Sequence, residues 1–267
     1  MKKFLKVTVV ILVLAMAMTL FSCGKKVKLK ILDTSYADEN YSICVAKENE
    51  KLLADINAAL DELTRDGTVG KIVDYYISGV AHNLVFQKNT DGLPVLTMGT
   101  NADFPPYEFI EGGKIVGIDA EIAAAIADKL QMRLEIDNMD FGAIIAAVQT
   151  GKVDIGMAGM TVTDERLESI NFSTSYAKGV QVIIVRDDSD IKSVDDLFSG
   201  DKIYKIGVQQ DTTGDLYATW DLEDEGLATI DRYNKGTDAV MALTSGKVDC
   251  VIIDIEPAKA FVEVNNK

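Results

Sequence analysis

Three short motifs in the sequence place charged or hydrogen-bonding groups where each could hold part of a small charged molecule. Arg166, in GMTVTDER, offers a guanidinium fork that matches a carboxylate. Thr212 and Thr213, in QQDTTGD, stand where a helix begins, and the free N–H groups and positive dipole end of a helix attract an anion. Asp254 ends the apolar run VIID, where a carboxylate needs a partner such as an ammonium group.

Each of these residues also has an ordinary structural interpretation. An arginine in a first helical turn is commonly a surface residue, a threonine there is commonly an N-cap, and Asp254 could cap the segment IEPA. Phe104, Tyr107 and Phe141 could equally belong to the core. Together, however, a cation, an anion-binding helix start, a lone carboxylate and aromatic walls are complementary to a free zwitterionic amino acid.

A repeat indicates how these groups are positioned. AVQTGKVDIGMAG (147–159) and ALTSGKVDCVIID (242–254) align without a gap. Each predicts a short helix that ends at a glycine, Gly151 or Gly246, followed by a buried parallel strand. Strands and helices alternate around both copies, so the sequence predicts an α/β fold with two lobes. Ligands bind outside the carboxyl ends of such strands, where Gly159 and Asp254 would face each other across a cleft.

The neighbouring elements follow from the apolar pattern. Around the first copy we expect a strand at 95–100, a hairpin that turns at 112–113, a helix at 119–130 and a strand at 132–137. Around the second copy we expect a strand at 204–210 and a helix that begins at 212.

The N-terminus has the pattern of an export signal. A short basic region precedes an apolar run that is too short for a comfortable membrane span, and LFSCG resembles a lipobox with Cys23 as the lipidated residue. Without residues 1–22 the formal charge falls from -15 to -18, which disfavours binding of nucleic acid. The acids show no clustered spacing of metal ligands. Cys44 and Cys250 are expected to be buried free thiols.

Four motifs identify a resemblance to a known family: GTNADFPPYEF, GKIVGIDAEIAAAIADKL, MDFGAIIAAVQTGKVDIGMAGMTVTDERLESINFS and VQQDTTGDLYA. The chain resembles the family 3 solute-binding proteins, the extracytoplasmic receptors of polar amino-acid ABC transporters. The resemblance implies a two-lobed, periplasmic-binding-protein-like (type II) α/β fold with a two-strand hinge. It also implies a monomer without catalytic residues or cofactor, anchored to the cell membrane through lipid on Cys23. Such a receptor delivers a free L-amino acid to permease subunits.

The order of the motifs is rotated relative to that family. GTNADFPPYEF usually comes first, and a segment like the one at 38–78 usually comes last, so the chain resembles a circular permutant. The expected organisation is a signal peptide (1–22), a first piece of the smaller lobe (23–33), a hinge strand (34–47), the larger lobe (48–177, with the old termini joined by 79–94), a second hinge strand (178–187) and the rest of the smaller lobe (188–267).

The resemblance also assigns roles to residues at matching positions. The ligand carboxylate would bind Arg166 and the N–H groups of Thr161 and Thr213, next to Thr212. The ammonium would bind Asp254, the Gly159 carbonyl and the Thr161 hydroxyl. The ligand side chain would lie between the rings of Phe104 and Phe141. Asn101, Tyr107 and Gln209 would line its far end.

The identity of the ligand rests on weaker signals. Amides at Asn101 and Gln209 favour a neutral polar side chain such as that of glutamine, whereas Asp103 or Asp211, turned inward, would favour a cation. Asp211 also departs from the family, which usually has glycine there. Two alternatives remain: a sensor that feeds a signalling partner, and a dehydratase of the same architecture. The dehydratase needs an acid or base in the cleft, and His82, the one histidine, lies in the joining segment.

Overall fold

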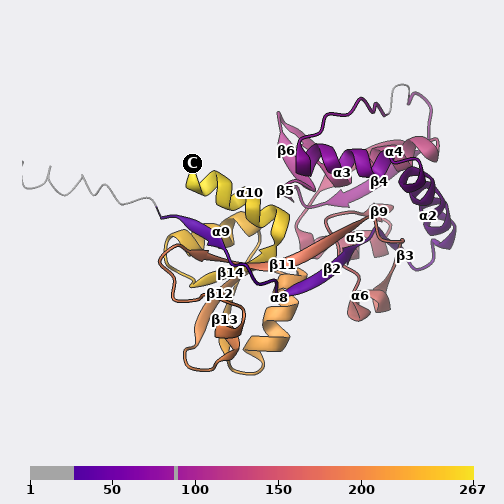
Figure 1. The fold of residues 1–267 in the computed structure, drawn as a ribbon. Coiled ribbons are helices and arrows are strands. Elements are labelled where there is room, and N and C mark those ends of the chain that lie inside the picture. Colours follow the sequence, from indigo (N-terminus) through magenta and orange to yellow (C-terminus); the bar gives the residue numbers. More distant parts are fainter. Residues whose placement is uncertain (1–26, 87–89) are drawn as a thin grey trace, which may run out of the picture.

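A computed structural model describes residues 27–86 and 90–267, so the expected signal peptide and Cys23 lie outside the described residues. The described chain forms two α/β halves side by side, each with a sheet covered by helices (Figure 1). The predicted α/β class is therefore confirmed. We call the two parts the six-stranded half and the five-stranded half after their main sheets.

The six-stranded half is built on a sheet with the order β1-β11-β14-β12-β13, and β2 also pairs with β11. β12 runs parallel to both β13 and β14, whereas β11 runs antiparallel to its partners. Its strands are β1 (Leu29–Ile31), β2 (Ala37–Tyr41), β11 (Ala177–Arg186), β12 (Tyr204–Gln209), β13 (Ala228–Tyr233) and β14 (Cys250–Asp254). Its helices are α7 (Asp195–Phe198), α8 (Thr213–Ala218), the π-helical η2 (Thr219–Glu223), α9 (Gly236–Thr244) and α10 (Ile255–Asn266).

The five-stranded half has the sheet order β10-β3-β9-β4-β8, and a small three-stranded sheet, β5-β6-β7, stands beside it. Its strands are β3 (Cys44–Ala46), β4 (Val95–Thr100), β5 (Asp103–Phe104), β6 (Glu108–Glu111), β7 (Lys114–Val116), β8 (Arg133–Asn138), β9 (Ile155–Gly156) and β10 (Ile170–Phe172). Its helices are α2 (Glu50–Arg65), α3 (Thr68–Ser78), α4 (Ile118–Lys129), the 3-10 turn η1 (Phe141–Ala143), α5 (Ile144–Gln149) and α6 (Asp164–Ser169).

Both copies of the repeat form the predicted elements. α5 and α9 each end before a glycine with a left-handed backbone, Gly151 at φ 67° and Gly246 at φ 73°. A Cβ atom disfavours this conformation, which explains the glycine in each copy. β9 and β14 follow and run parallel to β4 and β12 respectively. β9 has only two residues, because the chain leaves the ladder immediately after Gly156.

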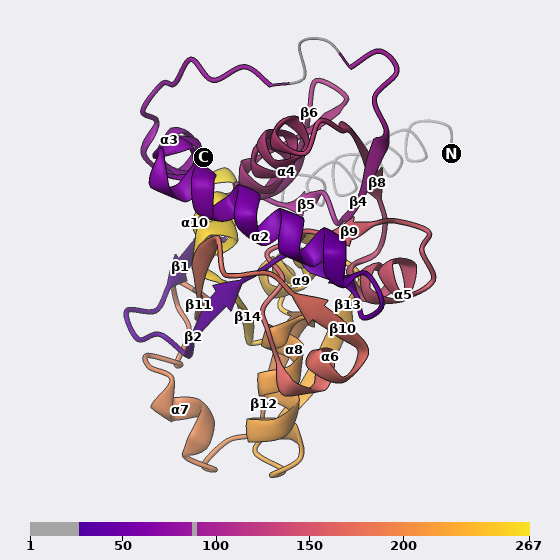
Figure 2. The same cartoon turned by 90° about the vertical axis from the view of Figure 1, so that its right-hand side faces the viewer.

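The start and the end of the described chain lie together in the six-stranded half. β1 pairs with β11, and the side chain of Asn266 bonds both backbone groups of Leu29 at 3.0 and 2.9 Å. The segment that follows β1 crosses to the other half, where α2 and α3 cover the five-stranded sheet together with α4 (Figure 2). The N-terminal part of the described chain therefore contributes to both halves, and the C-terminal part returns to the six-stranded half.

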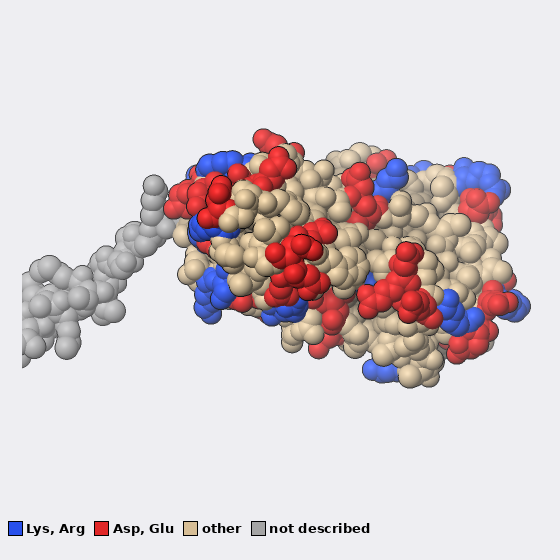
Figure 3. All heavy atoms as spheres, turned by 90° about the horizontal axis from the view of Figure 1, so that it is seen from below, with Lys and Arg blue, Asp and Glu red and all other residues tan. Residues whose placement is uncertain are grey.

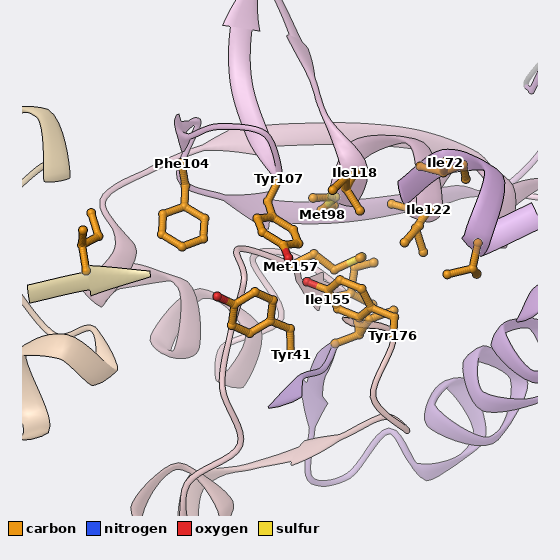
Figure 4. Packing of buried hydrophobic residues seen from close by; sticks show 14 of the residues in the cluster. Tyr41, Ile72, Met98, Phe104, Tyr107, Ile118, Ile122, Ile155, Met157 and Tyr176 are labelled. Carbon is orange, nitrogen blue, oxygen red and sulfur yellow. The ribbon is translucent and has the colours of Figure 1, made fainter. Parts of the chain in front are cut away.

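The largest apolar core continues through the junction between the halves. Tyr41, Tyr107 and Tyr176 gather there in Figure 4, and the rings of Tyr41 and Tyr107 meet edge to face at 5.1 Å. Buried aromatic pairs of this kind stabilise beyond their buried area. Cys44 and Cys250 are buried and unbridged, as expected.

Most acidic side chains of the described chain lie outside the core, and five are buried: Glu39, Glu108, Asp119, Asp215 and Asp254. In the face drawn in Figure 3, acidic side chains form several separate groups across both halves, with basic side chains between them. Within residues 27–86 and 90–267, no helix has the length and apolarity of a membrane span. The same residues hold no cluster of three or more potential metal ligands of the His, Cys, Asp or Glu type.

Candidate ligand-binding cleft

A narrow cavity lies between the two halves, at the ends of the strands as the repeat predicts. Nine of the eleven residues that the sequence analysis selected line it, and Glu108 and Ala158 complete its wall. The nine are Asn101, Phe104, Phe141, Gly159, Arg166, Gln209, Thr212, Thr213 and Asp254. The other two, Thr161 and Tyr107, stand behind the wall.

Arg166 provides a buried cation on the five-stranded side. It belongs to the short helix α6, and the Thr163 hydroxyl caps that helix by accepting a bond from the Arg166 N–H at 3.2 Å. Thr163 is therefore the N-cap of α6. The guanidinium is only 6% exposed, and its carbon lies 5.4 Å from the centre of the Phe141 ring. Burial lowers the pKa of Arg166 from 12.5. A guanidinium nevertheless stays protonated in proteins.

The hydrogen bonds of the Arg166 guanidinium go to backbone oxygens. Nη1 donates to the Thr161 carbonyl at 2.8 Å, and Nη2 donates across the cleft to the Asp211 carbonyl at 2.9 Å. Among the described residues Arg166 has no carboxylate within ion-pair distance. A buried guanidinium of this kind can receive the carboxylate of a ligand.

Asp254 provides a buried carboxyl on the six-stranded side. It ends β14 and is 6% exposed, and the Tyr41 hydroxyl donates a hydrogen bond to its Oδ1. The residue stands at the N-cap position of α10, but its side chain makes no capping bond, so capping does not explain the acid. Burial raises the pKa of Asp254 well above 3.8, and the charge of Glu39 raises it further. A cation bound in the cavity would lower the pKa of Asp254 again.

Thr212 and Thr213 lie at the start of α8, on the same side as Asp254. Thr212 is the N-cap, and its hydroxyl donates to the Gln209 carbonyl at 2.8 Å rather than capping the helix. The Thr213 hydroxyl lies 3.4 Å from Nε2 of Gln181. The structure thus places both residues beside Arg166 in one cavity, as predicted.

The apolar wall depends on a glycine. Gly159 has φ 53°, and a Cβ atom there would lie 2.6 Å from Cε1 of Phe104. The backbone of residue 159 can therefore approach the Phe104 ring only without a side chain. Its N–H donates to Oδ2 of Asp119 at 3.0 Å, which fixes the peptide at the cavity wall.

The two amides predicted at the far end of the ligand contact each other. Nε2 of Gln209 donates to Oδ1 of Asn101 at 2.9 Å, and Nδ2 of Asn101 donates to the Met139 carbonyl at 2.8 Å. Tyr107 was expected beside them, but its hydroxyl points to the Lys178 carbonyl at 3.5 Å and its ring packs on Tyr41. The structure therefore places Tyr107 in the junction core.

Thr161 stands behind the wall and is 5% exposed. Its carbonyl accepts the bond from Arg166, whereas its hydroxyl oxygen is buried and has no hydrogen-bond partner among the described residues. Residue 161 also forms a single antiparallel bridge with Tyr41, which ties α6 to the strand pair between the halves.

Glu108 is a cavity residue that the sequence reasoning missed. Glu108 and Asp119 are fully buried together, and Oδ2 of Asp119 accepts bonds from the Gly159 N–H and from the Tyr176 hydroxyl at 2.8 Å. Burial raises the pKa of Asp119 to about 6 and that of Glu108 well above its ordinary value. In the sequence, Glu108 looks like a solvated hairpin acid and Asp119 like a first-turn helix acid, so neither gave a signal.

Asp211, where the family usually has glycine, retains the backbone of a glycine. Its φ is 65°, which costs an L-residue energy, and its side chain lies at the exposed rim. The carboxylate reaches across to the five-stranded half, where a Cβ atom on Gly142 would lie 2.1 Å from its Oδ2. Asp211 therefore does not turn into the cavity.

Two α/β halves, paired strands between them and a cavity lined from both sides define a ligand-binding protein of the two-lobed type. The family model for bacterial extracellular solute-binding proteins, family 3, matches residues 96–242, and the chain belongs to that family. The predicted type II periplasmic-binding-protein-like fold is thereby confirmed.

Several relatives are similar over about two thirds of the chain. The arginine-binding extracellular protein ArtP of Bacillus subtilis (strain 168) is 35% identical over 175 residues, which cover 66% of this chain and 67% of the relative. A substrate-binding protein of an amino acid ABC transporter is 43% identical with a TM-score of 0.58, over 63% of this chain and 74% of that one. An ancestral arginine-binding protein bound to arginine is 38% identical with a TM-score of 0.61, over 65% and 75%. All three of these relatives are named as binding proteins.

Proposed function

We propose that this protein is a receptor that binds a free L-amino acid in its cleft and delivers it to an ABC importer. The observation that carries the proposal is the pair of buried charges on opposite walls of one cavity. Arg166 comes from the five-stranded half and Asp254 from the six-stranded half, and neither has an ion-pair partner among the described residues. A zwitterionic α-amino acid supplies one counter-charge to each.

Binding is coupled to closure of the two halves in this account. Hydrogen bonds between the described residues of the two halves hold the cleft closed, among them Arg166 to the Asp211 carbonyl, Gln209 to Asn101, and Thr237 to Asp103 at 2.9 Å. Because the cavity between them is narrow, entry of a ligand requires the halves to part. The ligand then contacts both walls, so it favours the closed state over the open one.

The moving bodies in this proposal are a larger lobe, 48–177, and a smaller lobe made of 23–33 and 188–267. The hinge strands are 34–47 and 178–187. The support is the pairing of β2 with β11, since the two strands run side by side between the halves (Figure 1).

The ligand side chain remains open between two classes. The amides of Asn101 and Gln209 favour a neutral polar side chain such as that of glutamine, and breaking their mutual bond would free one donor and one acceptor for it. A cationic side chain is the second candidate, because two of the three relatives named above are arginine-binding proteins. An ancestral arginine-binding protein bound to glutamine, 39% identical, shows both classes within one lineage of the family.

The chain is also proposed to be a circularly permuted, lipid-anchored monomer at the outer face of the bacterial cell membrane. The contacts of Asn266 with Leu29 and the pairing of β1 with β11 support a cut made in the surface of the smaller lobe. Lipid on Cys23 would then tether the smaller lobe, so closure would swing the larger lobe relative to the membrane. Permease subunits, or a signalling partner in the sensor alternative, would recognise the closed form.

The test is calorimetric titration of the chain from Gly24 onward against the common L-amino acids. Saturable binding of one ligand or of a related group, with one site per chain, is expected. Failure of every free amino acid to bind would contradict the proposal. For the ligand that binds, uptake into vesicles that contain the cognate permease separates a transport receptor from a sensor.

A further inference from the structure

Beside Asp254, the cavity side of the six-stranded sheet carries a second acid that the motifs do not contain. Glu39 lies on β2 opposite Gly179 of β11, and Asp254 lies on β14 opposite Gln181 of β11. Gly179 and Gln181 are two residues apart, so they and their partners project from the same face of the sheet. The two carboxyls, which we call the acid pair, therefore flank β11 on that face.

Gly179 allows other groups to reach the acid pair. A Cβ atom on this glycine would lie 2.3 Å from the Tyr41 hydroxyl and 2.4 Å from the ring carbon that bears it. The Tyr41 side chain thus passes over the glycine, and its hydroxyl donates to Asp254. A side chain at residue 179 would remove this contact, so the close approach requires glycine.

Glu39 is buried but incompletely satisfied. It is 4% exposed, and its Oε2 accepts a bond from Nε2 of Gln181 at 3.1 Å. Its Oε1 is buried and has no hydrogen-bond partner among the described residues. Because Nε2 of Gln181 also contacts the Thr213 hydroxyl, Glu39 is joined through one amide to the cavity wall. A buried carboxylate oxygen without a donor is costly, which points to a missing cation or proton.

The surroundings of the acid pair contain little positive charge. Five titratable side chains face it: Tyr41 on β2, Arg166 on α6, Tyr217 on α8, and Tyr107 and Glu108 from the β5–β6 hairpin. Arg166 is the one cation in this set, and its hydrogen bonds go to carbonyl oxygens. With so little compensation, burial and the adjacent carboxyl of Glu39 raise the pKa of Asp254 and favour its protonated form.

We propose that Glu39 is a positioning residue of the ammonium site, and that Asp254 beside it holds a proton which leaves when a ligand ammonium binds. This inference rests on the proposed function. The ligand R–NH3+ arrives with its own three protons and keeps them. The proton of Asp254 passes to the buffer, and its carboxylate then faces the ammonium.

The direction of the pH dependence follows from this exchange. A cation next to Asp254 lowers the pKa of that carboxyl, so the bound state holds fewer protons than the free state. Affinity must then rise with pH, by up to about tenfold per pH unit when one full proton is released. Burial and the charge of Glu39 together raise the pKa of Asp254, which moves this dependence toward neutral pH.

The test is calorimetry of the chain from Gly24 onward with L-arginine and L-glutamine, whose own groups do not titrate between pH 5.5 and pH 8. Titrations in phosphate and in Tris at one pH give the number of protons released, since the two buffers differ in ionisation enthalpy. The variant is Glu39→Gln, which keeps the shape and an oxygen for Gln181. The matched control is Asp38→Asn, the neighbouring exposed acid of β2.

We expect the wild type and Asp38→Asn to release protons and to bind several-fold more tightly per pH unit. In Glu39→Gln both the proton release and the pH dependence should shrink. The proton exchange would be overturned if the wild-type affinity did not change with pH and the binding enthalpy did not depend on the buffer. The receptor function would then be left intact. Unchanged behaviour in Glu39→Gln would overturn the role of Glu39. If the wild type bound no amino acid at all, the receptor function itself would fall.

Discussion

Replacing Arg166 with methionine should separate ligand affinity from stability. In the free protein the guanidinium donates to the Thr161 and Asp211 carbonyls at 2.8 and 2.9 Å. Loss of a donor to a buried carbonyl costs about 1–3 kcal/mol. Relief of a buried charge without an ionic partner acts in the opposite direction by several kcal/mol. We therefore expect the free energy of unfolding to change by less than about 2 kcal/mol.

The effect of Arg166→Met on ligand affinity should be much larger. Two bonds from a guanidinium to the ligand carboxylate are charge-assisted and contribute about 1.5–3 kcal/mol each. Their loss corresponds to a weakening of roughly a hundredfold to ten-thousandfold. Lysine should not restore the affinity, because it lacks the planar fork. Calorimetric titration and chemical denaturation of the same samples measure the two quantities.

Arg186 offers a matched control for this substitution. Its Nη1 also donates to two backbone carbonyls, those of Leu243 at 3.0 Å and Val248 at 2.8 Å, and it does not line the cavity. Arg186→Met should therefore lower stability and leave the affinity unchanged. If Arg166→Met weakened binding less than tenfold, or only in proportion to its loss of stability, Arg166 would not bind the ligand carboxylate.

Three further substitutions test other parts of the structure. Folding raises the pKa of Asp119 from 3.8 to about 6, so the contribution of Asp119 to stability is present below pH 4 and is lost as the pH rises through 6. In urea denaturation, the free energy of unfolding of the wild type, measured relative to Asp119→Asn, should fall by about 3 kcal/mol between pH 4 and pH 7. Asp211→Gly should bind the ligand a few-fold more tightly, because it removes a negative charge beside the carboxylate site and a side chain strained at a left-handed φ of 65°. Weaker binding in the titration would mean that the Asp211 carboxylate stabilises the closed form through its contact with Gly142. Asn266→Ala should lower the free energy of unfolding by about 1–2 kcal/mol, since two bonds to Leu29 are lost, and an unchanged denaturation midpoint would contradict this.

The sequence predicted the frame of the cleft because the frame follows from local patterns. The helix, glycine cap and strand of each repeat copy are short-range features, and a strand that leads into Gly159 or Asp254 must place it at the edge of its sheet. Arg166 could be selected for the same reason, since its position in the first turn of α6 follows from the cap at Thr163.

The rest of the site depends on contacts between distant segments. Glu39 lies beside Asp254 only because β2 pairs with β11, and its sequence neighbourhood, ADENY, reads as a polar loop. Tyr107 lies in the junction core because Tyr41, 66 residues earlier, supplies its partner ring. Glu108 is fully buried because β6 packs against α4 as well as within its own hairpin, whereas the local pattern predicts a solvent-facing hairpin acid. These are features of tertiary packing that no local pattern encodes.

The most direct measurement of the central claim is a titration with three forms of one ligand. For the L-amino acid that binds, the parent compound, its decarboxylated amine and its N-acetyl derivative remove the two charges one at a time. The account predicts tight binding of the parent only, with the amine losing affinity through Arg166 and the N-acetyl form through Asp254. Comparable affinity for all three would show that the cleft does not recognise the zwitterion, and would contradict the account.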